Sequence, residues 1–414
     1  MATKQWRGDA PQSPQFVTLT VGGTIAINDT FSVTINGKVL TYTATTTTVA
    51  DVATGVATAW QTLDIIAYPE FAEITATAVS TTVQLVAQTP GKPFTVSLSH
   101  VSTGGTWTQS TTKANSGPKD ISVAGNWLPS GTPGNGDDVY IDGDVDLLYG
   151  LDALSAVTLN SLNIAASFTG TIGLPFINND SVAAPYAEYR VQYLEVGATT
   201  SNIGTGDGNG SGRVKIDFGS VATTCNIYAT GRSLDSGLSS VQIKGTSGSN
   251  VVNVFGGTSD IAMQPGNSAT VSQLNVVPTS NSATARCGSG VTLTTLNLAA
   301  GTAELHAGAT TVNQTAGTLN VYGSGTVTTV NLDGGTLVYQ SSGTITTLNV
   351  GNGATADFTK NIASRTITNA NLFQGAVLTD TLKTVTFTNG IILNRCKIAD
   401  VKVDVGDNRT ITPS

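Results

Sequence analysis

The carboxylates best placed to do chemistry in this sequence lie in the stretch DDVYIDGDVD. Asp142, Asp144 and Asp146 alternate along it, so a β-strand would place all three side chains on one face. Carboxylates this close repel one another unless water or a hard cation such as Ca²⁺ lies between them. The glycine and final glutamate of an EF-hand loop are missing. The sequence therefore allows a solvated acidic edge or a site for Ca²⁺ or a monovalent ion at these three aspartates.

Carboxylates beside aromatic rings form the second candidate. Glycoside hydrolysis uses two carboxylates in a groove, and tyrosine rings offer flat apolar faces to sugars. Glu188 and Glu195 lie close in sequence to Tyr186, Tyr189 and Tyr193. The alternative is that these aromatic residues fill a packed loop or a subunit contact. The second half of the chain, which contains the regular repeat described below, is nearly free of acids and aromatics. We therefore expect no enzymatic activity and no catalytic residue.

Cysteine and histidine offer little further chemistry. Cys225, Cys287 and Cys396 are far apart and odd in number, which argues against a disulfide framework or a zinc site. We expect buried free thiols. The two histidines, His100 and His306, are also far apart, so a histidine-based metal site or triad is not expected. Apart from the Ca²⁺ considered above, the sequence predicts no cofactor.

The composition excludes several classes of function. Charged residues make up 11% of the 414 residues, against roughly 25% in a typical soluble protein, and the net charge is −8. A nucleic-acid binder needs a basic surface, so nucleic acid is not an expected partner. No apolar run approaches the ~18 residues of a membrane span, and the start MATKQWRGDAPQ has no signal-peptide core. We therefore expect synthesis in the cytoplasm and no membrane association.

A short motif recurs through the second half of the chain: a polar pair, an apolar residue, an asparagine and another apolar residue. Its asparagines are spaced by 22, 16, 18, 18, 22 and 23 residues. These intervals are too short for a βαβ unit but suit one coil of a solenoid. The asparagines are Asn275, Asn297, Asn313, Asn331, Asn349, Asn371 and Asn394.

Stacked coils also explain the composition. In a parallel solenoid each residue lies about 4.8 Å above its counterpart, so a repeated charge would become a column of repelling charges. Asparagine, serine and threonine can instead hydrogen-bond along such a column. The sequence therefore predicts a mainly β protein whose body, residues 126–394, is a right-handed parallel β-helix. A β-sandwich or a chain of small β domains is the alternative, because strands every 8–12 residues also occur there.

The remaining segments predict the other domains. Residues 1–14 would be an N-terminal arm, 15–105 a small α+β attachment module, and 106–125 a polar linker. The module would contain a hairpin turning at Asn36-Gly37 and an amphipathic helix after Thr48. Residues 126–150 would cap the start of the β-helix, with Trp127 over its open end, and 395–414 would form a charged C-terminal cap.

The module carries a resemblance to a known family. The stretches LTVGGTIAINDTFSVTINGKVLTYTATTTTVADVATGVATAW and LVAQTPGKPFTVSLS are similar to a module of structural proteins of tailed bacteriophages and prophages. The likeness rests on the Gly-Gly-Thr entry, the ND-x-F-x-V-T-I-N-G strand, the A-D-V-A helix and the T-P-G-K-P-F turn. It implies a virion protein whose module attaches to the particle and whose β-helix projects, and it carries over no catalytic residue.

Three functions follow as hypotheses. The first is a non-enzymatic virion protein that decorates or stabilises the capsid, with the major capsid protein or other virion proteins as partners and a homo-oligomer, expected as a trimer. The second is a tail fibre or tailspike that binds host surface glycans, with or without depolymerase activity. The third is a cell-surface adhesin, which the missing signal peptide disfavours.

Overall fold

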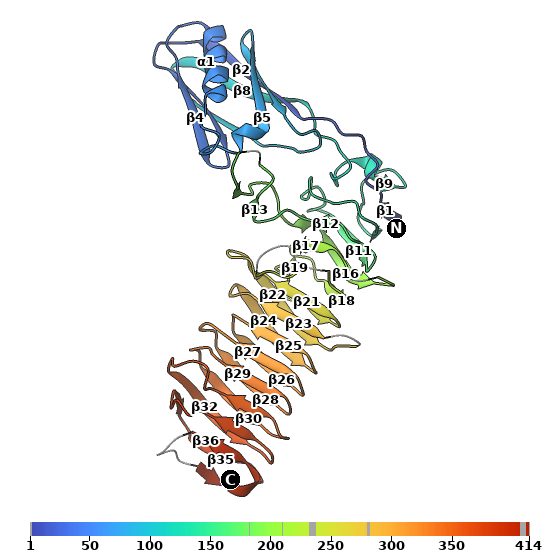
Figure 1. The fold of residues 1–414 in the computed structure, drawn as a ribbon, viewed down its shortest axis with the longest axis vertical. Helices are drawn as coiled ribbons and strands as arrows, with labels where there is room; N and C mark the ends of the chain where they lie inside the picture. Colours follow the sequence, from blue (N-terminus) through green and yellow to red (C-terminus); the bar gives the residue numbers. More distant parts are fainter. Residues whose placement is uncertain are drawn as a thin grey trace.

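The computed structural model describes residues 2–181, 183–208, 210–231, 237–279, 282–405 and 411–413. The protein is mainly β, with 47% strand and 6% helix, and it combines a small α+β module with a β-solenoid of about 12 turns over residues 138–412. In Figure 1 the module lies at the top, and the short strands of the solenoid are stacked below it. Each part has its own cluster of buried apolar side chains.

The module folds as antiparallel strands around a helix. Its sheets have the strand orders β5-β6-β2-β8 and β4-β3-β7, and α1 packs against β5, β2 and β4. Asn36 and Gly37 both have positive φ, as a tight hairpin between β3 and β4 requires, and this confirms the predicted turn. The elements are β2 Phe16–Thr24, β3 Thr30–Ile35, β4 Lys38–Thr43, α1 Val49–Gln61, the 3₁₀ turn Phe71–Glu73, β5 Ile74–Val79, β6 Thr82–Ala87, β7 Ser97–Val101 and β8 Gly104–Lys113.

The first solenoid sheet, here sheet 1, runs the length of the body. From its C-terminal end its order is β37-β35-β32-β30-β28-β26-β24-β22-β20-β18-β16-β11-β10-β1-β9, with β34 beside β32. The strands are β37 Ile411–Pro413, β35 Ile391–Leu393, β34 Val385–Phe387, β32 Arg365–Leu372, β30 Ile345–Val350, β28 Val327–Leu332, β26 Ala309–Gln314, β24 Val291–Leu298, β22 Ala269–Val276, β20 Val251–Val254, β18 Thr224–Ile227, β16 Gly197–Thr205, β11 Thr158–Ala165, β10 Asp138–Ile141, β1 Thr3–Trp6 and β9 Trp127–Leu128.

The second solenoid sheet, sheet 2, has the order β12-β17-β19-β21-β23-β25-β27-β29-β31-β33-β36, with β15 beside β17. The strands are β12 Thr171–Ile172, β15 Leu194–Glu195, β17 Arg213–Asp217, β19 Val241–Lys244, β21 Gly257–Ile261, β23 Ala283–Cys287, β25 Thr302–Leu305, β27 Thr318–Val321, β29 Thr336–Tyr339, β31 Thr355–Asp357, β33 Val377–Thr379 and β36 Lys402–Asp404. Successive strands pair in parallel, which confirms the solenoid and excludes the antiparallel β-sandwich.

The N-terminal residues belong to the solenoid, so the prediction of a separate arm over residues 1–14 was wrong. Strand β1 pairs in parallel with β10 and antiparallel with β9. The buried rings of Trp6 and Trp127 meet edge to face, with centroids 5.1 Å apart, at the start of the core. Trp127 therefore covers the open end as predicted, but with a partner from the chain's first residues. Figure 1 shows the N-terminus beside β9, away from the tip of the module.

This placement makes the module an insertion within the solenoid cap. The chain leaves β1, forms the module, and returns to β9, and the two connections pair with each other at Ser13 and Ser116. Strand β8 pairs with β2 up to Lys113. The module therefore extends beyond its predicted end at 105, and the linker predicted over 106–125 was placed too early. At the other end, β36 and β37 continue the two sheets into the predicted cap of 395–414, of which 406–410 and 414 lie outside the described residues.

A hairpin excursion lies between the first solenoid strands and the module. Residues 174–193 leave sheet 2 after β12 and form the antiparallel pair β13 Ile177–Asn178 and β14 Tyr186–Ala187. The side-chain amide of Asn36, at the module's hairpin turn, donates a hydrogen bond to the backbone oxygen of Ala187 at 3.0 Å. The excursion is therefore a third connection between the two parts, made by contact and not by the backbone. The last elements are the 3₁₀ turns Ala124–Asn126 and Ile398–Asp400.

Candidate functional site

The outer face of sheet 1 carries a continuous column of asparagine side chains. Within the described residues, each asparagine after the first donates an Nδ2 hydrogen bond to Oδ1 of the asparagine in the preceding turn, at 2.7 to 3.2 Å. All seven predicted asparagines belong to it, and four earlier ones extend it toward the module. The column is Asn163, Asn202, Asn226, Asn253, Asn275, Asn297, Asn313, Asn331, Asn349, Asn371 and Asn394.

The end of this column departs from strict register. Asn349 stands opposite Asn371 in the strand ladder, but Asn371 stands opposite Ile392 and not opposite Asn394. Asn394 reaches back to Asn371 with the longest bond of the column, 3.2 Å. The regular stack of asparagines therefore ends where the chain approaches its final turns.

Charged residues that meet in neighbouring turns have opposite signs at two places on sheet 2. Asp217 lies in register with Lys244, 3.1 Å away between charged atoms, and Asp260 lies in register with Arg286 at 2.7 Å. Glu304 then stands opposite Arg286 on the other side. Because like charges stacked one strand apart repel, this alternation keeps charge compatible with the solenoid.

Glu195 and Asp217 are an exception to this alternation, and exceptions of this kind are candidates for function. The two carboxylates stand in register on β15 and β17. Burial, together with the negative charges of Asp217 and Asp152, raises the pKa of Glu195 above its ordinary value. Lys244 partly offsets this effect on the pKa and also lies over the ring of Tyr193, 4.7 Å from its centre. The sequence singled out Glu195 but gave no sign of its partner Asp217.

The structure places Glu188, the other predicted glutamate, in a different environment. Its side chain is buried, and its Oε1 accepts hydrogen bonds from the backbone nitrogens of Tyr189 and Arg190. Its Oε2 accepts a bond from Asn178 Nδ2 at 2.7 Å. With both oxygens engaged in protein hydrogen bonds, Glu188 is part of the excursion's structure and does not face Glu195 in an acid pair.

Arg190 joins the excursion to the module. Its guanidinium lies 2.9 Å from Glu188 on the excursion and 2.7 Å from Glu73 on the module. Its Nε also donates to the backbone oxygen of Pro93 at 2.6 Å. The Arg190 and Glu188 side chains are 7% and 0% exposed, so these bonds lie in a region of low dielectric where removing either partner is costly. We call Glu73, Lys92, Tyr186, Glu188 and Arg190 the junction cluster.

Glu73 is the centre of the junction cluster. It accepts a bond from the Tyr186 hydroxyl at 2.7 Å and pairs with Lys92 at 2.7 Å, in addition to Arg190. Burial on its own would raise the pKa of Glu73, but the charges of Arg190 and Lys92 and the hydrogen bonds hold the pKa below its ordinary value. Glu73 is therefore charged at neutral pH and fixes the module against the excursion. The sequence singled out Tyr186 as a tyrosine close to Glu188 and Glu195, but it did not single out Arg190.

The three predicted metal-binding aspartates do not share a strand face. Strand β10 ends at Ile141, and the chain bends at Gly143, which has a positive φ. Asp142 Oδ1 accepts from Ser167 Oγ at 2.6 Å, and Asp146 pairs with Lys119 at 2.8 Å. Across the described residues no group of three His, Cys, Asp or Glu side chains is arranged to hold a metal ion. A calcium site at these aspartates stays a prediction, but the shared strand face that suggested it is not present.

The cysteines and histidines lie in separate environments. Cys225 and Cys287 are buried, and burial raises the pKa of each thiol to about 12. Cys396 is half-buried. His100 stacks on the ring of Phe31 in the module, whereas His306 stacks on Tyr322 in the solenoid.

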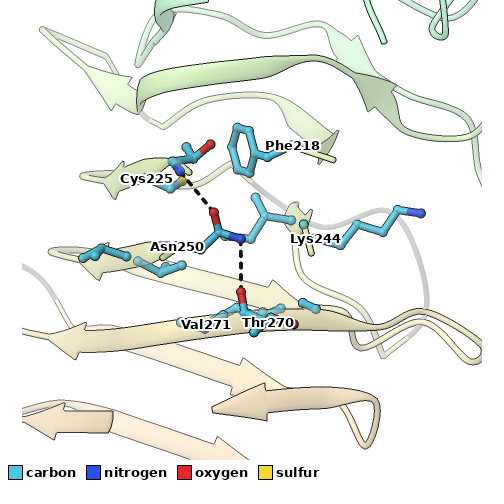
Figure 2. A pocket seen from close by; sticks show the side chains of 13 residues that line it. Phe218, Cys225, Lys244, Asn250, Thr270 and Val271 are labelled. Atoms are coloured by element: carbon cyan, nitrogen blue, oxygen red, sulfur yellow. Dashed lines mark hydrogen bonds between the residues drawn. The ribbon is translucent and has the colours of Figure 1, made fainter. Parts of the chain in front are cut away.

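A small internal cavity lies between the sheets near Cys225. Its volume is about 10 Å³, which is room for about one water molecule. Figure 2 shows that Asn250 spans it from side to side. Asn250 accepts a bond from the backbone nitrogen of Thr223 at 3.1 Å and donates to the backbone oxygen of Thr270 at 3.0 Å. The cavity is therefore a packing gap bridged by an amide and not a ligand site.

Comparison with known proteins adds no relative to these observations. No protein-family model matches the sequence, and no curated protein matches it. In the described part of the chain, no helix has the length and apolar character needed to cross a bilayer.

Proposed function

We propose that the chain is a non-enzymatic structural protein of a tailed-phage-type virion, which decorates or stabilises the capsid surface. The observation that carries the proposal is the neutral outer face of sheet 1, where the amides of neighbouring asparagines such as Asn331 and Asn349 satisfy one another. A catalytic groove would require carboxylates in such turns, but the regular turns from Val291 to Lys360 hold few charges. The resemblance of the module to phage structural proteins supports the virion location.

The junction cluster gives the proposal its mechanical basis. Two chain connections and the buried pair of Arg190 with Glu73 tie the module to the solenoid. These ties make the connection between module and solenoid stiff. A decoration protein needs a stiff connection, because the docked module must hold the solenoid at a fixed angle to the particle. The partners would be the major capsid protein or other virion proteins and two further copies of the chain, since symmetric homo-oligomers are the default in such assemblies.

Labelling of intact particles tests this function. Virions purified from the organism that encodes the chain would be treated with gold-coupled antibody against the solenoid and imaged by electron microscopy. The proposal predicts label spread over the heads. Label confined to tails would favour a fibre, and particles that carry no label and no peptides of this chain by mass spectrometry would contradict a virion role. Analytical ultracentrifugation of the purified chain tests the trimer.

A tailspike-type protein that binds or hydrolyses host glycans is the second candidate, favoured by Glu195 and Asp217. In-register carboxylates with a raised pKa on one of them fit an acid and a nucleophile. Release of reducing ends from host envelope polysaccharide tests this candidate. Glu195→Gln should abolish such release, whereas Glu304→Gln, on a regular turn, should not. No release by the unaltered protein would reject the hydrolytic form of this candidate.

A further inference from the structure

The outer faces of the two solenoid sheets differ in charge. In the described strands of sheet 1 from β11 to β35, Arg365 is the one charged residue, and its side chain is buried. Sheet 2 carries half-buried charged side chains in several of its turns. They include Asp217, Lys244, Arg286, Glu304 and Asp357. The outer face of sheet 1 is therefore uncharged over most of the solenoid, whereas the outer face of sheet 2 is not.

Stacking within one chain does not explain this difference. Both sheets are parallel ladders that place corresponding residues in register, as with Thr329 and Thr347 on sheet 1. Sheet 2 shows that the ladder tolerates charges of alternating sign, because Asp260 pairs with Arg286 in the next turn. The same alternation would have been open to sheet 1. Depletion of charged residues is typical of contact surfaces, so a contact with a partner accounts for the uncharged face.

A rotation axis parallel to the solenoid supplies the missing constraint. Around such an axis every residue faces its own copies at the same height, so a charged residue would face the same charge. Alternation of sign along the column cannot relieve this repulsion. Threonine and asparagine can face copies of themselves, because each offers a hydrogen-bond donor and an acceptor. The charge pattern therefore indicates further copies of this chain, and not an unrelated protein, as the partner of sheet 1.

The face consists of columns of neutral polar side chains. Beside the asparagine column, threonines of successive turns stand in register at positions 295, 311, 329 and 347. The residue before each of them is an exposed threonine. These exposed residues are Thr294, Thr310, Thr328 and Thr346. Their hydroxyls can donate to or accept from a neighbouring copy.

The dimensions of the face suit this contact. The asparagine column from Asn163 to Asn394 spans about 48 Å at about 4.8 Å per turn. Six-residue strands such as β28 and β30 are about 20 Å wide, so the face covers about 1,000 Å². A stable interface takes about 800 Å² from each partner. Three faces of this width arranged as a triangle lie roughly 6 Å from its centre, near half of the ~10 Å spacing between packed sheets.

We propose that copies of this chain associate through the outer faces of sheet 1, around an axis parallel to the solenoid. Thr328 of one copy then lies level with Thr328 of its neighbours. The proposal rests on the self-association included in the proposed function, but it does not depend on a virion location.

Sedimentation velocity over a range of concentrations tests the contact with charge variants of the full chain. Thr328→Lys and Thr328→Glu should each weaken association about 100-fold, since like charges would then meet at one height. An equimolar mixture of the two variants should associate again, because lysine of one copy then meets glutamate of another. A variant that had merely lost its fold would not be restored by mixing, and circular dichroism of each variant checks the fold directly.

Thr318→Lys is the matched control. It places the same charge on sheet 2, on the neighbouring strand β27, and should associate as the unaltered protein does. Association that survives both changes at Thr328 would overturn the sheet 1 contact and leave self-association through another surface. Dissociation of both variants without recovery on mixing would contradict the parallel axis. An unaltered chain that is monomeric at all concentrations would overturn both the contact and the expected homo-oligomer, while particle labelling would still decide the virion location.

Discussion

Nη2 of Arg190 lies 2.7 Å from Oε2 of Glu73, although 117 residues separate the two in sequence. Glu73 belongs to the inserted module and Arg190 to an excursion of the solenoid, so this pair joins the two cores of the protein. Its burial distinguishes it from exposed ion pairs, which contribute little to stability. The orientation of the module therefore depends on a small number of buried polar side chains.

Replacing this arginine tests that dependence. Arg190→Met removes the cation that pairs with the buried Glu188 carboxylate and leaves Glu73 with Lys92 as its remaining cationic partner. We expect a loss of about 3–5 kcal/mol in the free energy of unfolding, measured by denaturant titration. The matched control is Lys360→Met, whose pair with Asp357 is 3.9 Å long with the lysine largely exposed, and which should cost less than about 1 kcal/mol. Equal effects of the two variants would contradict a structural role for the cluster.

The pH dependence of stability gives a second test. The pKa of Glu73 in the folded protein is held below its ordinary value of 4.5, so the folded state binds this proton less readily than the unfolded chain does. Its stabilising contribution is therefore complete above about pH 4.5 and is lost as the pH falls through the folded-state pKa.

Thermal melting between pH 6 and pH 3 measures this effect. Glu73→Gln should melt at a lower temperature than the unaltered protein at pH 6, and the difference should shrink toward pH 3. Glu304→Gln is the control, because Glu304 lies outside the junction cluster. A difference between Glu73→Gln and the unaltered protein that stays constant over this range would show that the Glu73 charge does not contribute.

Thiol labelling tests the packing of the solenoid core. Cys225 and Cys287 are fully enclosed and have a raised thiol pKa, so the native protein should not expose a reactive thiolate at either position. We expect Ellman's reagent to react with at most Cys396 in the native state and with all three cysteines in denaturant. Rapid native reaction at Cys225 or Cys287 would contradict the close packing between the sheets.

The periodic part of the fold was predictable because its determinants are local and repeat. Asn275 and the asparagines after it recur at intervals of 16 to 23 residues, and each interval closes one turn of the solenoid. Trp127 and the hairpin turn at Asn36 were also recognisable, since each depends on residue type within a short segment. The asparagines at 163, 202, 226 and 253 escaped notice because the intervals between them are longer, at 39, 24 and 27 residues.

The contacts that join distant segments were not predictable. Strand β1 has no repeat motif, and its pairing with β10 spans more than a hundred residues, so its place in the solenoid leaves no local signal. The same holds for Arg190 with Glu73 and for Asp217 beside Glu195, since each pair comes from different elements. The geometry expected for Asp142, Asp144 and Asp146 was wrong because β10 ends at Ile141, before the first of them, and the chain then bends at Gly143.

The account depends most on the claim that successive turns place corresponding side chains in direct register, where like charges repel. A double-mutant cycle with Asn331→Asp and Asn349→Asp measures this directly, because these side chains are bonded at 2.8 Å in adjacent turns. At pH 7 the free energies of unfolding should show a destabilising coupling of about 1–3 kcal/mol, as expected for two carboxylates one strand apart in a half-buried setting. Mutual repulsion raises the folded-state pKa of the pair, so the coupling should disappear as the pH falls below it.

The control cycle pairs Asn331→Asp with Asn371→Asp, two turns away, and should show a much smaller coupling at pH 7 because the charges are about twice as far apart. Stacked register predicts a large coupling at pH 7 between adjacent turns and a small coupling between alternate turns. It also predicts that the coupling is absent at low pH. Equal coupling in the two cycles, or no coupling between positions 331 and 349 at pH 7, would contradict it.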